Sequence, residues 1–364
     1  MQRVRNPPRL HSPGPAERPG LLDPLRPLAV LLCSPLRIGA AATVVGAVFA
    51  LLRVEVAANG NVAGLVVAGS AYVHHAPHTS SLPIMAGTGY DGQFYYRMAL
   101  APLNWSRNAL GIHLDTLARL DRISYPAIVW LLSAGQASAA ALMMVMVNVA
   151  GLGVLAGLSS AFAQQAGQRP LWGLLVAGFW GFLWTVSRDL TELTAAVFVM
   201  AGLLALRKGR PVVAGAALAV AVLAREPALV VVGAVFVSRA WDALLGTRKR
   251  ARAEWRGGAD ATWVLPCLAF AGWQLLLHSG TGHFPALSSG GANLALPFTG
   301  LAGGFNHYAA LLPRVSALLW FGELGVMAAV AGLAALCLRA GAAPLHERIA
   351  WMASILLAVT LARG

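Results

Sequence analysis

The chain has 364 residues, of which 58% are hydrophobic and 11% are charged. A soluble protein of this size needs far more polar surface, so this composition excludes a water-soluble enzyme and indicates that lipid surrounds most of the chain. The formal net charge of +13 would also suit a nucleic-acid-binding protein. Here the basic residues accompany apolar segments, so we expect no nucleic acid among the partners.

The N-terminal segment, residues 1–34, is rich in proline and arginine. Such a segment buries too little apolar surface to offset the entropy of ordering, and we expect a disordered, basic cytosolic tail. The first apolar stretch begins near Leu36, is long enough to cross a membrane, and has no small-residue cleavage site. It is therefore predicted to be a retained anchor and not a signal peptide. Residues 35–364 form the predicted transmembrane domain.

Apolar segments recur along the rest of the chain, and about 20 apolar residues cross a hydrocarbon core of about 30 Å. We predict about nine transmembrane helices, near residues 36–56, 136–162, 171–187, 190–206, 211–224, 227–241, 260–278, 315–338, and 349 to the end. A further helix over 123–134 has Pro126 in its first turn and is expected to lie at the membrane interface. The predicted fold is all-α, a polytopic helical bundle.

The basic residues predict the orientation of this bundle, because short cytoplasmic loops carry an excess of Lys and Arg. Basic clusters fall at residues 207–210 and 248–252, on the same side as the N-terminal tail. The large loops near 57–135 and 279–314 then lie on the opposite, extracytoplasmic side, together with six of the fourteen acidic residues: Asp91, Asp115, Asp121, Asp189, Glu192 and Glu226. We therefore expect a multi-pass protein with a cytoplasmic N-terminus and its chemistry on the outer face.

The first candidate cluster is GYDGQFYYR, residues 89–97, in the first outer loop. Asp91 precedes a glycine that permits close approach of a substrate, so Asp91 is a candidate general base or metal ligand. Tyr90 and Gln93 flank it as candidate substrate-binding residues. The alternative is a simple Asp-Gly turn followed by aromatic side chains that anchor the loop in the headgroup zone.

The second cluster is SRDLTE, residues 187–192, between two apolar segments. Arg188 and Glu192 are four residues apart, and Asp189 and Glu192 are three apart, so one helical face would hold all three. Three such groups at bilayer depth are costly, so they must face a cavity or the interface. The alternative is an internally ion-paired hairpin tip.

The third cluster is Arg225 and Glu226, where Pro227 by itself explains a break between helices. An arginine beside a carboxylate also occurs in the second cluster. Both clusters lie on the predicted side of Asp91, which favours one shared site. Nearby, Arg122 follows Arg119 and is a candidate phosphate-binding residue, because guanidinium groups bind phosphate in a bidentate manner. Snorkelling at the membrane surface is the alternative for these arginines.

Other polar residues give weaker signals. His74, His75 and His78 have a loose metal-like spacing within a surface loop, and Glu323 lies inside a predicted span, where it is either functional or a polar contact between helices. The three cysteines show no metal-ligand spacing or disulfide framework. No metal ligands are assigned, and a divalent metal as cofactor remains open.

The three clusters together resemble a known family. The sequence is similar to the GT-C class of membrane glycosyltransferases, and more closely to a bacterial family associated with cell-surface glycopolymer formation, whose members carry GYDGQFYYRLAL-like, SRDLTE and TRE-like segments. Here these read GYDGQFYYRMAL at 89–100, SRDLTE at 187–192 and AREP at 224–227. The resemblance extends from about residue 36 to 240. The chain departs from the pattern at Ala101 and Leu193, where the family often has aspartate and proline.

The resemblance implies a membrane enzyme in the bacterial inner (plasma) membrane. Its donor would be a polyprenyl-phosphate sugar, its acceptor a cell-surface glycan or lipid-linked molecule, and Asp91 the essential acidic residue of the first outer loop. A transporter or flippase for a lipid-linked intermediate remains an alternative, although the sequence has no inverted repeat. A non-catalytic assembly partner of a glycopolymer complex is a third reading.

Overall fold

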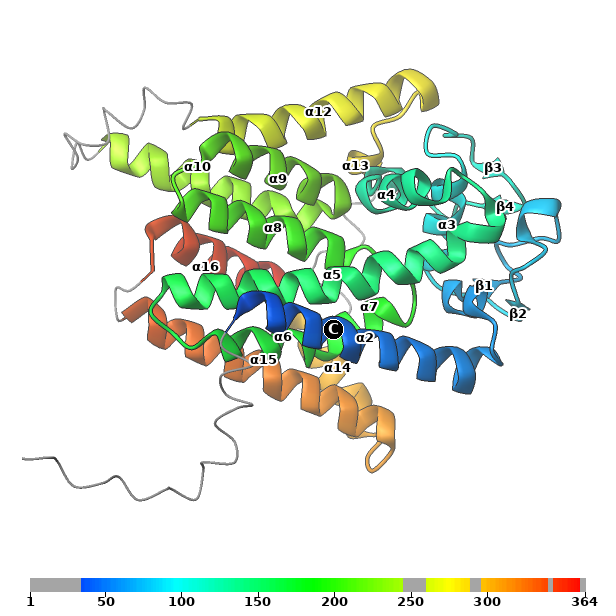
Figure 1. Cartoon of the computed structure of the whole chain (residues 1–364), viewed down its shortest axis with the longest axis horizontal. Coiled ribbons are helices and arrows are strands. Elements are labelled where there is room, and N and C mark those ends of the chain that lie inside the picture. The colour runs from blue at the N-terminus through cyan, green and yellow to red at the C-terminus, as the bar shows by residue number, and fades with distance from the viewer. Residues whose placement is uncertain (1–33, 245–259, 289–295, 340–342, 361–364) are drawn as a thin grey trace, which may run out of the picture.

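A computed structural model describes residues 34–244, 260–288, 296–339 and 343–360 (Figure 1). The predicted tail lies outside these residues apart from Ser34, as does the basic run 248–252. The described part is mostly helical, with only two short pairs of strands. The expectation of a helical membrane protein is confirmed.

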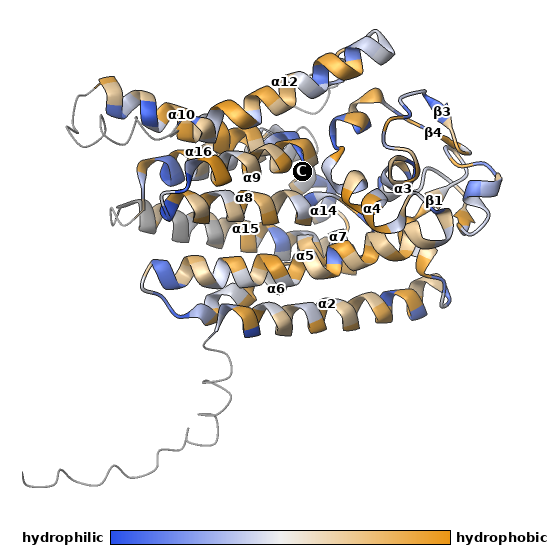
Figure 2. Ribbon diagram, turned by 45° about the horizontal axis from the view of Figure 1, so that its top comes forward, coloured by the Kyte–Doolittle hydropathy of each residue, from blue (hydrophilic) through white to orange (hydrophobic). Residues whose placement is uncertain are grey.

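Long helices run side by side along the molecule (Figure 1). They occupy eight of the nine predicted positions: α2 (Pro35–Ala58), α5 (Ala137–Gln165), α8 (Glu192–Arg207), α9 (Pro211–Ala224), α10 (Leu229–Leu244), α12 (Ala261–Thr281), α15 (Val315–Arg339) and α16 (Leu345–Val359). Hydrophobic residues dominate their lengths, and hydrophilic residues gather at their ends and in the loops (Figure 2). This distribution is the one expected of helices whose sides face lipid.

The predicted span over 171–187 is not one helix. The structure divides it into η5 (Pro170–Gly173), α6 (Leu174–Ala177) and α7 (Trp180–Val186). The backbone of Phe179 is extended, with φ −70° and ψ 119°. Glycine is a poor helix former, and glycines 173, 178 and 181 weaken the helix throughout this segment.

Helix length also revises the number of spans. Within the described ranges, four segments are long and apolar enough to cross a membrane: α2, α5, residues 226–244 and α12. The 16 residues of α8 extend only about 24 Å at 1.5 Å per residue, short of a hydrocarbon core of about 30 Å. The chain is therefore a helical membrane protein with four candidate spanning helices, fewer than the predicted nine.

Small residues bring α2 and α5 into close contact. A Cβ atom on Gly39 would lie 2.9 Å from the carbonyl oxygen of Gly153, and one on Gly153 would lie 1.8 Å from Thr43 Oγ1. Gly153 and Gly157 form a small-xxx-small pattern, which lets helix backbones approach where lipid supplies no hydrophobic driving force. This contact holds together the two helices that the segment 59–136 connects.

The segment predicted to be the first outer loop, residues 59–136, is a compact subdomain at one end of the bundle, and we call it the outer subdomain (Figure 1). It contains η2 (Val62–Val66), β1 (Ala68–Gly69), η3 (Pro77–Thr79), β2 (Ile84–Met85), α3 (Gly92–Leu100), β3 (Asn108–Ala109), β4 (Ile112–His113), η4 (Leu117–Asp121) and α4 (Ser124–Ser133). Strands β1 and β2 pair in parallel, with Ala68 opposite Ile84, and β3 and β4 pair antiparallel, with Asn108 opposite His113. The described part of the segment between α12 and α15, predicted to be the second outer loop, contains α13 (Pro285–Ser288) and α14 (Thr299–Ala309).

Two sequence expectations for this subdomain have different outcomes. The helix predicted over 123–134 is present as α4, and it exposes Trp130, Leu131 and Leu132 near its C-terminal end. The alternative that the aromatic run after Asp91 is an interfacial anchor is wrong. Phe94 and Tyr95 are at most 2% exposed, because α3 is packed inside the subdomain.

The opposite end of the bundle has a separate ion pair. Arg207, at the end of α8, donates from Nε and Nη2 to the two carboxylate oxygens of Glu347 in α16, at 2.7 Å each. This bidentate pair ties two helices together far along the bundle from the outer subdomain (Figure 1). This pair serves as a control for the ion pairs at the other end of the bundle.

Candidate functional site

Asp91 stands immediately before α3, where a carboxylate is favoured by the positive end of the helix dipole. The next residue, Gly92, lies directly against the backbone of Arg188. A Cβ atom on Gly92 would be 2.5 Å from the carbonyl oxygen of Arg188 and 2.8 Å from that of Val66. Glycine is therefore required there, and this contact brings the first and second clusters together.

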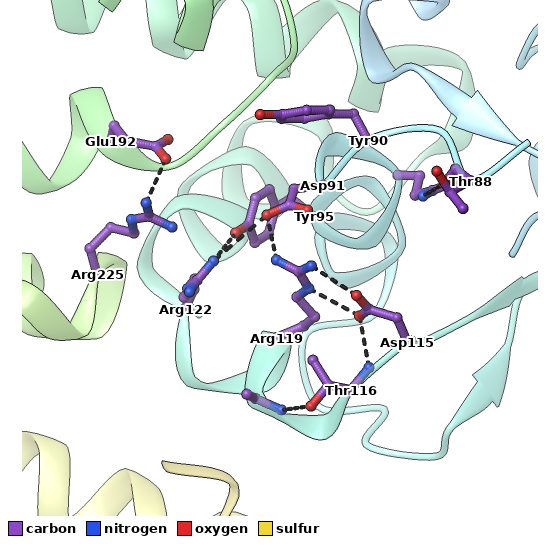
Figure 3. A network of polar contacts seen from close by, with 12 residues as sticks. Thr88, Tyr90, Asp91, Tyr95, Asp115, Thr116, Arg119, Arg122, Glu192 and Arg225 are labelled. Atoms are coloured by element: carbon purple, nitrogen blue, oxygen red, sulfur yellow. Dashed lines mark hydrogen bonds and ion pairs between the residues drawn. The ribbon is translucent and has the colours of Figure 1, made fainter. Parts of the chain in front are cut away.

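The Asp91 carboxylate is held by two arginines (Figure 3). Its Oδ2 atom accepts a hydrogen bond from Arg119 Nη1 and lies 3.8 Å from Arg122 Nη1. Arg119 is fixed in turn by Asp115, with Nε–Oδ1 and Nη2–Oδ2 distances of 3.0 and 2.8 Å. The Oδ1 atom of Asp91 is engaged by neither arginine, and the side chain is 29% exposed. One carboxylate oxygen thus stays accessible.

Arg122 connects the first cluster with the third. Its Nη1 donates to the hydroxyl oxygen of Tyr95 at 2.9 Å, and its Nε lies 3.2 and 3.3 Å from the two carboxylate oxygens of Glu226. Tyr95 is buried, four residues after Asp91. Sequence reasoning missed Tyr95 as a site residue, although that spacing on a helix beginning at Gly92 was the available signal.

The second and third clusters are joined by an ion pair between Glu192 Oε1 and Arg225 Nη2, 2.8 Å apart. The expectation that Arg188, Asp189 and Glu192 share one helical face is wrong, because α8 begins only at Glu192. Asp189 precedes it with a left-handed φ of +52°. This reversal sends the Arg188 and Glu192 side chains to different neighbours.

Arg188 does not contact Asp91. Its guanidinium carbon lies 3.3 Å from the ring centroid of Trp184 and 5.2 Å from that of Tyr90, in a cation–π arrangement. Trp184 Nε1 donates to the Tyr90 hydroxyl at 3.3 Å. Among the described residues, Arg188 has no carboxylate partner, whereas Arg119, Arg122 and Arg225 each have at least one. The charge of Arg188 is therefore not balanced by a carboxylate of the described chain.

From the sequence, Asp189 is expected to orient the arginines or to bind acceptor hydroxyls, and its surroundings do not suit the first of these roles. Its side chain is fully buried, and neither carboxylate oxygen has a hydrogen-bond partner among the described residues. It therefore does not orient the arginines, which Glu192 and Glu226 do. Burial raises the pKa of Asp189 well above its usual range, and we expect a neutral carboxyl group.

Gln93 is also occupied by the protein itself. Its Oε1 atom accepts from the backbone N–H of Gly69 at 3.0 Å, and its Nε2 donates to the carbonyl oxygen of Thr88 at 2.8 Å. With both ends of the amide engaged and the side chain 1% exposed, Gln93 holds the loop that precedes Asp91. The geometry gives no support to the predicted substrate contact.

Sequence reasoning also missed the contact between η4 and α12. The buried carboxylate of Asp121 accepts from Gln274 Nε2 of α12 at 2.6 Å, and Trp273 Nε1 donates to the carbonyl oxygen of Leu120 at 2.9 Å. Burial raises the pKa of Asp121 to about 7, against the hydrogen bond from Gln274, which lowers it. These bonds seat η4, which carries Arg119, on a helix about 150 residues away in the chain.

The candidate metal ligands are not brought together. Over the described ranges, no group of three or more His, Cys, Asp or Glu side chains is arranged to hold a metal ion, and this includes His74, His75 and His78. Glu323 lies on the wall of an apolar cavity. The guanidinium groups of Arg119 and Arg122 instead form a connected network with the carboxylates of Asp91, Asp115 and Glu226. The Glu192–Arg225 ion pair lies beside this network as a separate contact (Figure 3).

No family model matches the chain, and comparison with the curated proteins and with the solved structures found no match. The chain is a helical membrane protein whose outer subdomain and helix ends converge on one partly exposed, arginine-bound aspartate.

Proposed function

We propose that this protein is a GT-C-type glycosyltransferase that moves a sugar from a polyprenyl-phosphate donor to a cell-surface glycan or lipid-linked acceptor. The observation that carries the proposal is the Asp91 carboxylate, held through Oδ2 by Arg119 and Arg122 while Oδ1 stays accessible. A carboxylate fixed in this way is oriented for one proton transfer. Its position beside apolar helices suits a substrate that arrives from lipid.

The chemistry follows from these residues in a single inverting step. The acceptor hydroxyl oxygen forms a bond to the anomeric carbon, and its proton passes to Asp91 Oδ1. The bond from the anomeric carbon to the phosphate oxygen breaks, and polyprenyl phosphate leaves with the electron pair. Arg188, the guanidinium without a carboxylate partner among the described residues, is the group available to stabilise the leaving phosphate.

The remaining charged residues hold the arginines in position. Glu226 and Tyr95 hold Arg122, Glu192 holds Arg225, and Asp115 holds Arg119. Because Arg122 and Arg225 are already neutralised by carboxylates, they serve the phosphate less well than Arg188 does. This differs from the sequence-based expectation, in which Arg188 and Arg225 stabilise the departing phosphate and Arg122 is an additional candidate.

The proposed orientation places this site outside the cytoplasm of a bacterial inner membrane, with the N-terminus inside. The basic residues 207–210 and the network around Asp91 are at opposite ends of the bundle (Figure 1), which supports that orientation. Helices α8, α9, α15 and α16 and the segments within 171–187 would complete a nine-span GT-C-like bundle, with the short helices crossing a locally thinned bilayer or only part of it.

The test is transfer of labelled sugar from polyprenyl-phosphate donors to a host-membrane acceptor extract by the purified full chain. We expect Asp91→Asn to reduce transfer by roughly 10² to 10⁴-fold, since it removes the proton acceptor but keeps the shape. Asp242→Asn, in α10, is the matched control and should retain transfer. Full activity of Asp91→Asn would overturn the assignment of the base. Binding of donor without turnover by any variant would favour a flippase or an assembly partner.

A further inference from the structure

A cavity of about 660 Å³ lies between α7 with the residues preceding it and the first half of α15. Its walls are mostly apolar, with Phe179, Trp180 and Trp184 on one side. On the other side Leu318, Gly322 and Val326 repeat every four residues and so share one face of α15. The volume is within the range of sites that bind organic ligands, about 300 to 1,000 Å³.

One end of this cavity leads to the site. Trp184, part of the cavity wall, stacks under the guanidinium of Arg188 at 3.3 Å and donates a hydrogen bond to Tyr90. Tyr90 directly precedes Asp91 in the chain, and Figure 3 shows its ring beside the network of Asp91. Trp184 and Tyr90 therefore connect the apolar cavity with the Arg188 guanidinium and with the candidate base Asp91.

Arg188 lacks a counter-charge. No carboxylate among the described residues pairs with it, and its Nε atom is buried without a hydrogen-bond acceptor. A buried guanidinium without counter-charge is costly, and a bound anion would relieve that cost.

We propose that the cavity binds the isoprenoid chain of a polyprenyl-phosphate lipid, with the phosphate on Arg188. The assignment rests on the proposed function for the choice of lipid, while the cavity and the position of Arg188 on its wall residue Trp184 come from the fold. Glu323 also lines the cavity and would repel a phosphate, whereas Arg188 would attract it, so we place the headgroup at Trp184. A sugar attached to that phosphate then reaches Tyr90 and Asp91.

The test measures binding by the purified full chain in nanodiscs, using three probes: a polyprenyl phosphate, the polyprenol of the same length, and dioleoyl phosphatidate. Two variants separate the two halves of the site. Gly322→Trp fills the cavity, since nothing lies within 4 Å of a Cβ atom there, and Arg188→Gln removes the cation. Gly332→Trp, on the same helix and equally unobstructed but outside the cavity, is the matched control.

We expect saturable binding of polyprenyl phosphate that Gly322→Trp and Arg188→Gln each weaken by roughly tenfold or more, since each removes about 1.4 kcal/mol or more of binding. Gly332→Trp should bind as the unmodified chain does, and Arg188→Lys should recover part of the loss. Arg188→Gln should also abolish the preference for polyprenyl phosphate over polyprenol.

Three results would overturn the proposal. Equal binding of phosphatidate would make the cavity a general phospholipid site. Equal binding of polyprenol would reject the headgroup position, and equal loss in Gly322→Trp and Gly332→Trp would reject the cavity. Because none of these measurements uses sugar transfer, selective binding without any transfer would refute the proposed function alone.

Discussion

The Nε atom of Arg122 lies 3.2 and 3.3 Å from the two carboxylate oxygens of Glu226, a residue 104 positions further along the chain. The same guanidinium reaches Tyr95 and Asp91 with Nη1. One side chain of the outer subdomain therefore connects α3 with the turn between α9 and α10. Arginine suits this role because its planar group presents several donors in fixed directions.

A double-mutant cycle tests this connection. We expect Arg122→Gln and Glu226→Gln each to lower the free energy of unfolding by about 1 to 3 kcal/mol, with an interaction energy within the 0.5 to 3 kcal/mol typical of contacting residues. Thermal unfolding in detergent would measure it. Removing the Arg207–Glu347 pair should also cost stability but leave transfer unchanged, since that pair lies away from Asp91. Additive effects of the two substitutions would contradict a direct interaction between Arg122 and Glu226.

Asp189→Asn tests whether that buried group acts through a charge. A neutral asparagine retains the shape of a protonated aspartate and tolerates the left-handed φ of +52°. We expect unchanged or higher stability and at least half of the transfer activity. Asp189→Leu introduces a larger, apolar side chain and should lower the free energy of unfolding by about 1 to 3 kcal/mol. Loss of transfer in a stable Asp189→Asn protein would restore the original expectation that its charge orients the arginines.

The raised pKa of Asp121 predicts a pH dependence of stability. Between about pH 4, where a free aspartate titrates, and about pH 7, the folded state binds more protons than the unfolded state does. The free energy of unfolding should therefore fall as pH rises through this window, by at most about 1.4 kcal/mol per pH unit. Asp121→Asn keeps an acceptor for Gln274 and should remove this part of the slope. An unchanged slope from pH 4 to 7 would refute the assignment.

Gly92→Ala tests the contact between the first two clusters. The added methyl group would meet backbone oxygens of Arg188 and Val66 at 2.5 and 2.8 Å, and backbone atoms do not move aside cheaply. We expect a loss of about 1 to 3 kcal/mol of stability, together with reduced transfer. Gly272→Ala, a helical position of α12 with nothing within 4 Å, should gain about 0.5 to 1 kcal/mol. Similar behaviour of the two variants would mean that the contact is not tight.

The sequence determined the membrane class and the positions of most helices. Long apolar segments allow few alternatives, because backbone groups in lipid must be satisfied within the segment. Residues 35–58 and 137–165 were therefore recognisable from composition alone. The break within 171–187 was less evident, since glycines weaken a helix without excluding it.

Only the tertiary structure decided which charged residues meet. Spacing suggested that Arg188 and Glu192 share a face, but the left-handed turn at Asp189 sends Arg188 to Trp184 and Glu192 to Arg225. The partners of Asp91 are 28 and 31 residues away, and no local periodicity encodes such contacts. They depend on how the outer subdomain packs on the helix ends, which is set by many weak contacts acting together.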